Sequence, residues 1–388
     1  MFGYLITAAL IGVVVFLVVR HFRAKDEVTG QPIIPLETDF HPIHRGKIHV
    51  HSHGEDGPCK FSREEVRRTM HQKVDPIDIS NLPAREPFVE KLLACIRADE
   101  LTDLVAGLSG EKAVYVGDKS VILKSRSSHG EGVYLAMTWL EQFYRSLSIT
   151  ATRIPYTIRG KTYFNLEAKV AGKMTGAKKR VYIYGSHLDS TAGNTWSNEK
   201  VAPGADDDGS GTIAVLKIAE AFNSLVIPDD VEIRFLHFTG EEQGLWGSIK
   251  YSDACAAAKD NIVGMIQCDM IGYCRTTEHM FDVHDNIDQN GSHVLTIAIV
   301  RAIAQYGLNL KPIDTHNNAI EGRSDHAGFL NHGYKAVLVS ERFTDEDFTP
   351  YYHQVTDTVD KFRMPFYVDI IRALIAAGVN LTGITGKK

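Results

Sequence analysis

Hydrophobic positions along the first half of the chain follow two different periods. Apolar side chains recur at helical spacing over 87–110 and 130–148, and the first of these stretches ends at a glycine. Segment 162–172 instead alternates apolar and polar positions, as a half-exposed strand does. The pattern therefore predicts two amphipathic helices followed by a strand.

Beyond residue 180, short apolar runs alternate with longer helical patterns. This alternation is typical of an α/β sandwich around a largely parallel sheet. The runs that we expect to form strands are 180–186, 231–240, 262–270 and 336–340. The helical patterns lie at 211–225, 246–259, 292–307 and 366–383.

The N-terminus differs from the rest of the chain. Residues 1–19 carry no charged side chain and are about long enough to cross a bilayer as a helix. A basic segment follows at 20–25, whereas a secretory signal peptide has its positive charge before the apolar run. We interpret residues 1–25 as an uncleaved membrane anchor with a basic flank. The positive-inside rule alone would place the rest of the chain in the cytoplasm.

Residues 26–85 have no regular period, and we interpret them as a tether and N-terminal extension before a catalytic domain at 86–388. A histidine-rich patch occupies His41–His53. Alternating histidines at 49, 51 and 53 could bind a metal, but no carboxylate or cysteine completes a ligand set at suitable spacing. We therefore favour a polar strand face or loop for this patch.

Composition narrows the possible partners. The net charge is −6 and no long lysine- or arginine-rich block is present, which argues against a nucleic-acid partner. The five cysteines are odd in number and form no CxxC pair. A disulfide framework or a thiolate zinc site is therefore not expected.

Histidines and acids directly follow several of the expected strands. In open α/β sheets the binding crevice lies outside the carboxyl ends of the strands, so these side chains should meet at one rim. A run of three aspartates at 206–208 also precedes a predicted helix. The residues after the strands are His187, Asp189, Glu241, Glu242, Asp269 and His353.

This set of donor atoms indicates a metal site. Imidazole nitrogen and carboxylate oxygen without thiolate suit Zn²⁺ or a similar divalent ion. Two histidines and at least three carboxylates are too many for one open catalytic zinc, and they fit two ions that share a bridging carboxylate. We expect one aspartate of 206–208 to be that bridge and its neighbours to support the backbone.

Six motifs carry a family resemblance. The segments "GSHLDS", "APGADDDGSG", "TGEEQGLWGS", "QCDMIGY", "SDHAGF" and "YYHQVTDT" resemble, in order and spacing, those of the di-zinc aminopeptidases of metallopeptidase family 28. The match runs from about residue 86 to the C-terminus. It implies a three-layer αβα sandwich around a mixed, mainly parallel sheet, and hydrolysis of the N-terminal peptide bond of peptides with a free N-terminus. Relatives in this family are often exported, so the side of the membrane stays open.

The resemblance also implies individual roles. Glu241 would be the general base, and Asp189 would orient His187 from behind. A cis peptide bond would follow Asp207. The implied ligands of two zinc ions are His187 and Asp269 on one ion, Glu242 and His353 on the other, and Asp207 on both.

The substrate pocket is less well specified. Where well-known secreted members have a disulfide loop, this chain reads "NAIEGR". Glu321 and Arg323 in this segment could face the pocket, although surface charges on a loop are the interpretation we favour. The preferred N-terminal residue therefore stays open. Residues that could line the pocket are Met270, Phe343, Phe348 and Tyr352.

Three other functions compete with this interpretation. Glutaminyl cyclases share the fold, but typically carry tryptophan where this chain has Tyr352. A binding protein that had lost its metals would lack ligands, and none is missing here. A carboxypeptidase or dipeptidase would carry an inserted domain between Asp269 and His353, for which the chain has no room.

Overall fold

The computed structural model describes residues 77–175, 178–285, 290–315, 320, 322–344 and 347–387. The predicted membrane anchor, residues 26–76 of the predicted extension with the histidine patch, and Glu321 lie outside the described residues.

A mixed sheet of eight strands forms the centre of the fold, in the order β3-β4-β6-β5-β7-β10-β8-β9. The four central strands, β6, β5, β7 and β10, are parallel, whereas β4 pairs antiparallel with β6 and β8 antiparallel with β10. The predicted mixed, mainly parallel sheet is confirmed. The strands are β3 (Ala151–Ile158), β4 (Lys161–Ala171), β5 (Arg180–His187), β6 (Val231–Phe238), β7 (Ile262–Cys268), β8 (Met280–His284), β9 (Lys311–Thr315) and β10 (Ala336–Ser340).

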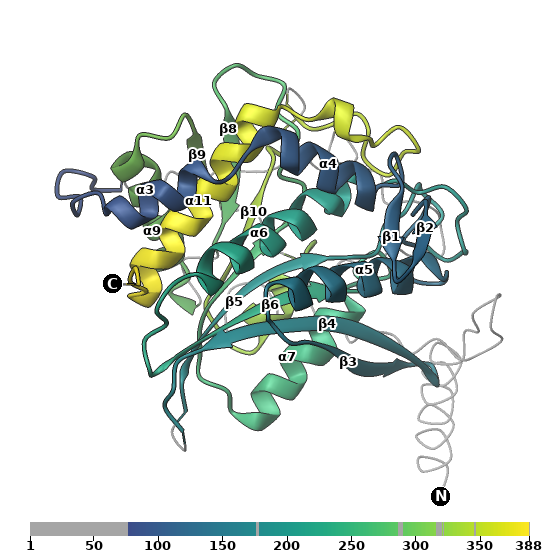
Figure 1. The fold of residues 1–388 in the computed structure, drawn as a ribbon, viewed down its shortest axis with the longest axis horizontal. Coiled ribbons are helices and arrows are strands. Elements are labelled where there is room, and N and C mark those ends of the chain that lie inside the picture. The colour runs from purple at the N-terminus through teal and green to yellow at the C-terminus, as the bar shows by residue number, and fades with distance from the viewer. Residues whose placement is uncertain are drawn as a thin grey trace, which may run out of the picture.

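Helices cover both faces of this sheet (Figure 1). One hydrophobic core joins α3, α4, α5, α6, α9 and α11 to one face, and a second joins α7 and α10 to the other. The three-layer αβα sandwich is therefore confirmed. The helices are α3 (Pro87–Ala94), α4 (Ala98–Leu108), α5 (Gly132–Ser146), α6 (Gly211–Asn223), α7 (Trp246–Ala258), α9 (His293–Tyr306), α10 (His326–Asn331) and α11 (Met364–Thr382).

The C-terminal helix α11 is the central helix of its layer. Proline in its first turn and a left-handed glycine, Gly383, after its last turn define its ends. Among the described residues it is the one helix long and apolar enough to cross a membrane, but 67% of its most apolar window is buried inside the protein. Its apolar surface packs against α9 and α6, as in a core helix.

Several elements differ from the sequence prediction. The single helix expected over 87–110 is divided into α3 and α4, because the amides of Cys95 and Ile96 bond to carbonyls three residues back and turn Ile96 into the core. The edge strand β3, which contains Pro155, was not expected, and neither were β8, β9 and α10. A small antiparallel hairpin of β1 (Val114–Val116) and β2 (Lys119–Val121) was also not expected.

Candidate metal centre

The parallel strands bring the candidate site residues to one edge of the sheet. His187 is the last residue of β5, Asp269 follows β7 directly, and Glu242 lies in the turn after β6. Asp207 lies in a tight turn over Ala205–Ser210 that leads into α6, and His353 lies in the loop after β10. All five side chains are buried. The structure thus brings together the five residues that the sequence suggested as ligands.

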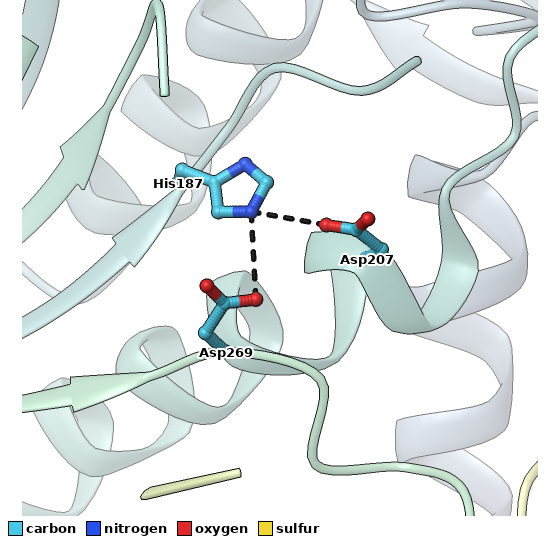
Figure 2. A group of neighbouring side chains, drawn as sticks. All are labelled: His187, Asp207 and Asp269. Atoms are coloured by element: carbon cyan, nitrogen blue, oxygen red, sulfur yellow. Dashed lines mark ion pairs between the residues drawn. The ribbon is translucent and has the colours of Figure 1, made fainter. Parts of the chain in front are cut away.

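The first group of side chains surrounds His187 (Figure 2). Its Nε2 atom lies 3.1 Å from Oδ1 of Asp207 and 3.5 Å from Oδ1 of Asp269. The imidazole comes from a strand end, one carboxylate from a helix start and the other from the neighbouring strand end. The three ligand atoms lie within 4.8 Å of one another, close enough to hold one ion.

A second group surrounds His353 and shares Asp207 with the first. The Nε2 atom of His353 lies 3.2 Å from Oδ2 of Asp207 and 3.1 Å from Oε2 of Glu242. The two carboxylate oxygens of Asp207 therefore face two different imidazoles. Glu241 has its Oε2 atom 4.0 Å from His187 Nε2 and forms a further candidate group with His187 and Glu242.

The charges in this centre fit divalent cations. Burial raises the pKa of Glu242 to about 7 and raises that of Glu241 well above its usual range. Burial lowers the pKa of His353, but the carboxylates of Glu242 and Asp207 outweigh this and raise it to about 10. Buried anions at this density need compensating positive charge, and nitrogen and oxygen donors without sulfur suit zinc.

Asp189 contacts His187 through its backbone carbonyl, and the turn that carries Glu241 and Glu242 through its carboxylate. Its backbone carbonyl lies 3.0 Å from Nδ1 of His187, which leaves Nε2 directed at the carboxylates. Its carboxylate lies 3.8 Å from the same Nδ1 atom. That carboxylate accepts hydrogen bonds from Oγ of Ser128 at 2.9 Å and from the amides of Glu241 and Glu242 at 3.4 Å.

The two other aspartates of the triplet hold backbone rather than facing the histidines. Asp208 accepts a hydrogen bond from the amide of His187 at 3.0 Å, and the peptide bond between Asp207 and Asp208 is cis, as the resemblance implied. Asp206 accepts hydrogen bonds from the amides of Gly272 and Tyr273 at 2.7 and 3.2 Å. The triplet therefore joins the ends of β5 and β7 to the start of α6.

The sequence analysis did not identify several supporting residues. Ser324 donates a hydrogen bond to Oδ2 of Asp269 at 2.6 Å, and Asp357 accepts hydrogen bonds from the amides of Asp206 and Asp207. Buried Arg126 lies behind the turn that carries Asp207. Ser324 and Asp357 belong to motifs already noted, "SDHAGF" and "YYHQVTDT", but their partners depend on the three-dimensional arrangement.

Comparison with known proteins decides the family. The profile described as "Peptidase family M28" matches residues 165–377, more than half of the chain. The chain belongs to peptidase family M28. The prediction of a hydrolase of this family is therefore confirmed.

Two relatives illustrate how far the similarity of this M28 peptidase extends. It is 26% identical over 291 residues to "Leucine aminopeptidase 1" of Arthroderma otae, covering 71% of this chain and 74% of that protein. It is 28% identical over 197 residues to a "Probable zinc metalloprotease" of Pyrenophora tritici-repentis, covering 45% of this chain and 39% of that protein. The second alignment spans less than half of that relative.

Solved structures share the fold of the M28 peptidase. The LapA aminopeptidase of Legionella pneumophila superposes with a TM-score of 0.63 at 19% identity, covering 80% of this chain and 78% of that one. The glutaminyl cyclase of Porphyromonas gingivalis superposes with a TM-score of 0.58 at 16% identity, covering 74% and 98%. At these identities the superpositions show a common fold and no more.

A hollow beside the metal centre of the M28 peptidase contains most of the expected pocket residues. Besides His187, Asp207, Glu241, Asp269 and His353, its lining includes Met270, Arg323, Ser324, Leu338, Phe343 and Tyr352. Phe348 does not line it but lies behind, with its ring 5.4 Å from those of Phe343 and Tyr352. The ring of Tyr352 stacks on His353 at 3.7 Å.

Proposed function

We propose that this chain is a zinc aminopeptidase that uses two ions to hydrolyse the N-terminal peptide bond of peptides. The observation that carries the proposal is the position of Asp207, whose two oxygens lie 3.1 and 3.2 Å from the imidazoles of His187 and His353. One carboxylate facing two ligand groups is the geometry of a bridge. The names of the relatives, a leucine aminopeptidase and a zinc metalloprotease, support the same activity.

In this proposal the residues present would form two sets of zinc ligands. His187 and Asp269 would hold one ion, Glu242 and His353 the other, and Asp207 both. When bound, the ions would supply Lewis-acid chemistry, polarising the scissile carbonyl and making a water molecule acidic near neutral pH. Asp189 and Asp208 would keep His187 in place through the contacts to its Nδ1 and its backbone amide.

Glu241 is the candidate general base. It lines the hollow together with His187 and Asp269, and its backbone amide is held by the carboxylate of Asp189. It would take a proton from the attacking water and pass it to the leaving amine. Burial raises its pKa above the ordinary value of a glutamate.

The hollow indicates which part of a peptide would occupy it. Its lining includes apolar Met270, Leu338 and Phe343 and the ring of Tyr352, which stacks on His353. An apolar N-terminal side chain would bury its surface there, and the free α-amine would lie against the acids and ions. We therefore propose peptides with a free amine and an apolar first residue as substrates. Arg323 also lines this hollow.

We also propose that residues 86–388 are the catalytic domain, and that residues 26–85 connect it to a membrane anchor at 1–25. The uncharged N-terminal segment and its basic flank support this arrangement. Treating intact cells with an added protease would test it. Cleavage would place the domain outside the membrane, and protection that ends on lysis would place it inside. Release of the intact chain by high salt without detergent would contradict the anchor.

Hydrolysis assays on the full-length chain test the proposed activity. We expect release of leucine from leucyl-arylamide and from a short peptide, loss of release with a chelator, and recovery with zinc. A peptide that begins with glutamine separates the cyclase alternative, since a cyclase would form a ring at that residue and an aminopeptidase would release it. A chain that bound little zinc and hydrolysed neither substrate would be a non-catalytic relative.

A further inference from the structure

Arg126 is a fully buried side chain behind the metal centre. Its guanidinium donates hydrogen bonds to four backbone carbonyls. Nε bonds to Leu188 at 2.8 Å, and Nη2 bonds to Gly204 at 2.8 Å. Nη1 bonds to Leu108 at 3.0 Å and to Pro203 at 2.6 Å. No side-chain carboxylate is among these acceptors, so the contacts fix the course of the backbone.

The positions of these carbonyls connect Arg126 to two of the expected ligands. Leu188 directly follows His187, and Gly204 comes just before the turn that carries Asp207. The intervening loop, which the structure describes throughout, contains no named helix or strand. One guanidinium therefore holds both ends of the loop that joins the first imidazole to the bridging carboxylate. The glycine end is tightly packed, because a Cβ at Gly204 would lie 2.3 Å from the carbonyl oxygen of Asp207, 2.6 Å from Cβ of Ser190 and 3.1 Å from Nη2 of Arg126.

The backbone of Arg126 makes a second contact with the loop between His187 and Asp207. The backbone amide of Arg126 donates to Oγ of Ser190 at 3.1 Å, and that hydroxyl donates to the carbonyl of Ala202 at 2.7 Å. Two residues further along, Ser128 holds the carboxylate of Asp189. The segment around Arg126 thus contacts the loop between the ligands at both of its ends.

The charge of Arg126 and its hydrogen bonds would have opposite effects on metal affinity. Its guanidinium lies in the field of the carboxylates of Asp357, Asp208, Asp189 and Asp207, and although burial lowers its pKa to about 10 it stays charged at neutral pH. A buried cation near a metal site disfavours metal binding by repulsion, whereas a correct ligand spacing favours it. The two effects predict opposite outcomes when the residue is changed.

We propose that Arg126 is a positioning residue that sets the separation of His187 and Asp207 and thereby the affinity for the ion that these two share with Asp269. The inference rests on the proposed two-zinc site. Geometry outweighs repulsion because a planar guanidinium has five N–H groups in a fixed fork, and four buried carbonyls depend on them. A lysine ammonium has three donors and a different shape, so it would leave buried acceptors without a partner.

Arg126→Lys is the decisive variant, since it keeps the charge and removes the fork. Arg234→Lys is its matched control. Arg234 is also largely buried, but it bonds to Glu232 and Asp260 near the opposite ends of the strands from the metal centre. Zinc titration of the metal-free full-length chains gives the affinity of each ion, and the visible spectrum of the Co²⁺-substituted proteins reports the ligand geometry.

We expect the parent chain to bind two ions, and Arg234→Lys to bind each of them with the same affinity as the parent. Arg126→Lys should bind one ion as the parent does and the other at least about tenfold more weakly, with an altered Co²⁺ spectrum and partial recovery of kcat in excess zinc. Arg126→Met should also bind more weakly, although it removes the repulsion.

Two results would overturn the inference: parent-like binding of both ions by Arg126→Lys, or tighter binding by Arg126→Met. If Arg126→Lys does not fold, Arg126→Gln, which keeps a planar polar head but has too few donors for the four carbonyls, takes its place, and parent-like binding of both ions by that variant would equally overturn it. A parent chain without two ions would instead contradict the proposed function, and this inference with it.

Discussion

The carboxylate of Asp357 accepts a hydrogen bond from the backbone amide of Asp207 at 3.1 Å. Asp357 also accepts hydrogen bonds from the amide of Asp206, at 3.0 and 3.2 Å. It lies in the segment that follows His353, so it joins the loop of one expected zinc ligand to the turn that carries the bridging carboxylate. Its own side chain is buried and belongs to none of the candidate ligand groups among the described residues.

Asp357→Ala should therefore weaken zinc binding without removing a ligand. Loss of the acceptor leaves two buried amides without their partner, which costs about 1–3 kcal/mol. We expect the zinc affinity to fall roughly tenfold or more, and Asp357→Asn, which keeps one acceptor oxygen, to lie between alanine and the parent. Zinc titration of metal-free protein measures this. Equal affinities in all three proteins would contradict the supporting role.

Glu241→Gln should separate catalysis from metal binding. The change keeps the size of the side chain and removes the carboxylate that would accept the proton, so kcat should fall about 10²–10⁴-fold or more. The zinc content should stay at the parent value, because Glu241 is not an expected ligand. Metal analysis and steady-state kinetics on the same preparation check both points. Full activity of this variant would refute Glu241 as the base.

Phe343→Ala should alter selectivity at the apolar wall of the hollow. Removing this ring takes away contact with the side chain of the first residue, worth about 1–3 kcal/mol in a hydrophobic pocket. We expect kcat/KM for leucyl-arylamide to fall about 10–100-fold and that for alanyl-arylamide to fall much less. A matched control is Phe348→Ala, whose ring lies behind Phe343. Equal losses for both substrates would show that Phe343 does not face the first side chain.

His237 gives the folded protein a specific sensitivity to acid. Its ring nitrogens contact the hydroxyls of Tyr144 at 2.8 Å and Ser186 at 2.9 Å. Burial lowers its pKa from 6.5 to about 3. The unfolded chain therefore binds a proton below about pH 6.5 that the folded chain excludes. The free energy of unfolding should fall as the pH decreases from about 6.5 toward 3, by up to about 1.4 kcal/mol per unit from this residue.

Urea unfolding of the metal-free protein at pH 7 and pH 5 measures this contribution. We expect His237→Gln to be less stable than the parent at pH 7, where the buried ring packs and bonds well. Its loss of stability between the two pH values should be smaller than that of the parent by about 2 kcal/mol. The same pH slope in both proteins would show that His237 takes up its proton in the folded state.

The central part of the fold could be predicted because its strands are buried on both faces. β5, β7 and β10 are almost continuous apolar runs, which distinguishes them from the helices around them. Strands at the edges of the sheet have weaker patterns. β3 is half exposed and contains Pro155, whereas β8 and β9 interrupt their apolar positions with charged residues such as Asp282 and Asp314. The break between α3 and α4 depends on the burial of Ile96, which a helical period alone does not reveal.

The grouping of the candidate ligands could be anticipated because they follow strands whose carboxyl ends must share an edge. The supporting contacts could not, since they join segments that are distant in sequence. Arg126 appears in an unremarkable stretch, and only the folded chain brings it to the carbonyls of Leu188 and Gly204. The backbone support expected of the neighbours of Asp207 is found in Asp208, but that its partner is the amide of His187 follows only from the folded chain.

Zinc stoichiometry tests the account most directly. The full-length chain, loaded with zinc and dialysed, should contain two zinc ions per chain, and chelation should abolish hydrolysis of leucyl-arylamide. Asp207→Asn should lose both ions together, because one carboxylate faces both histidines. A parent chain that retains full activity after its metal has been removed, or an Asp207→Asn variant that still binds two ions tightly, would contradict the two-zinc centre.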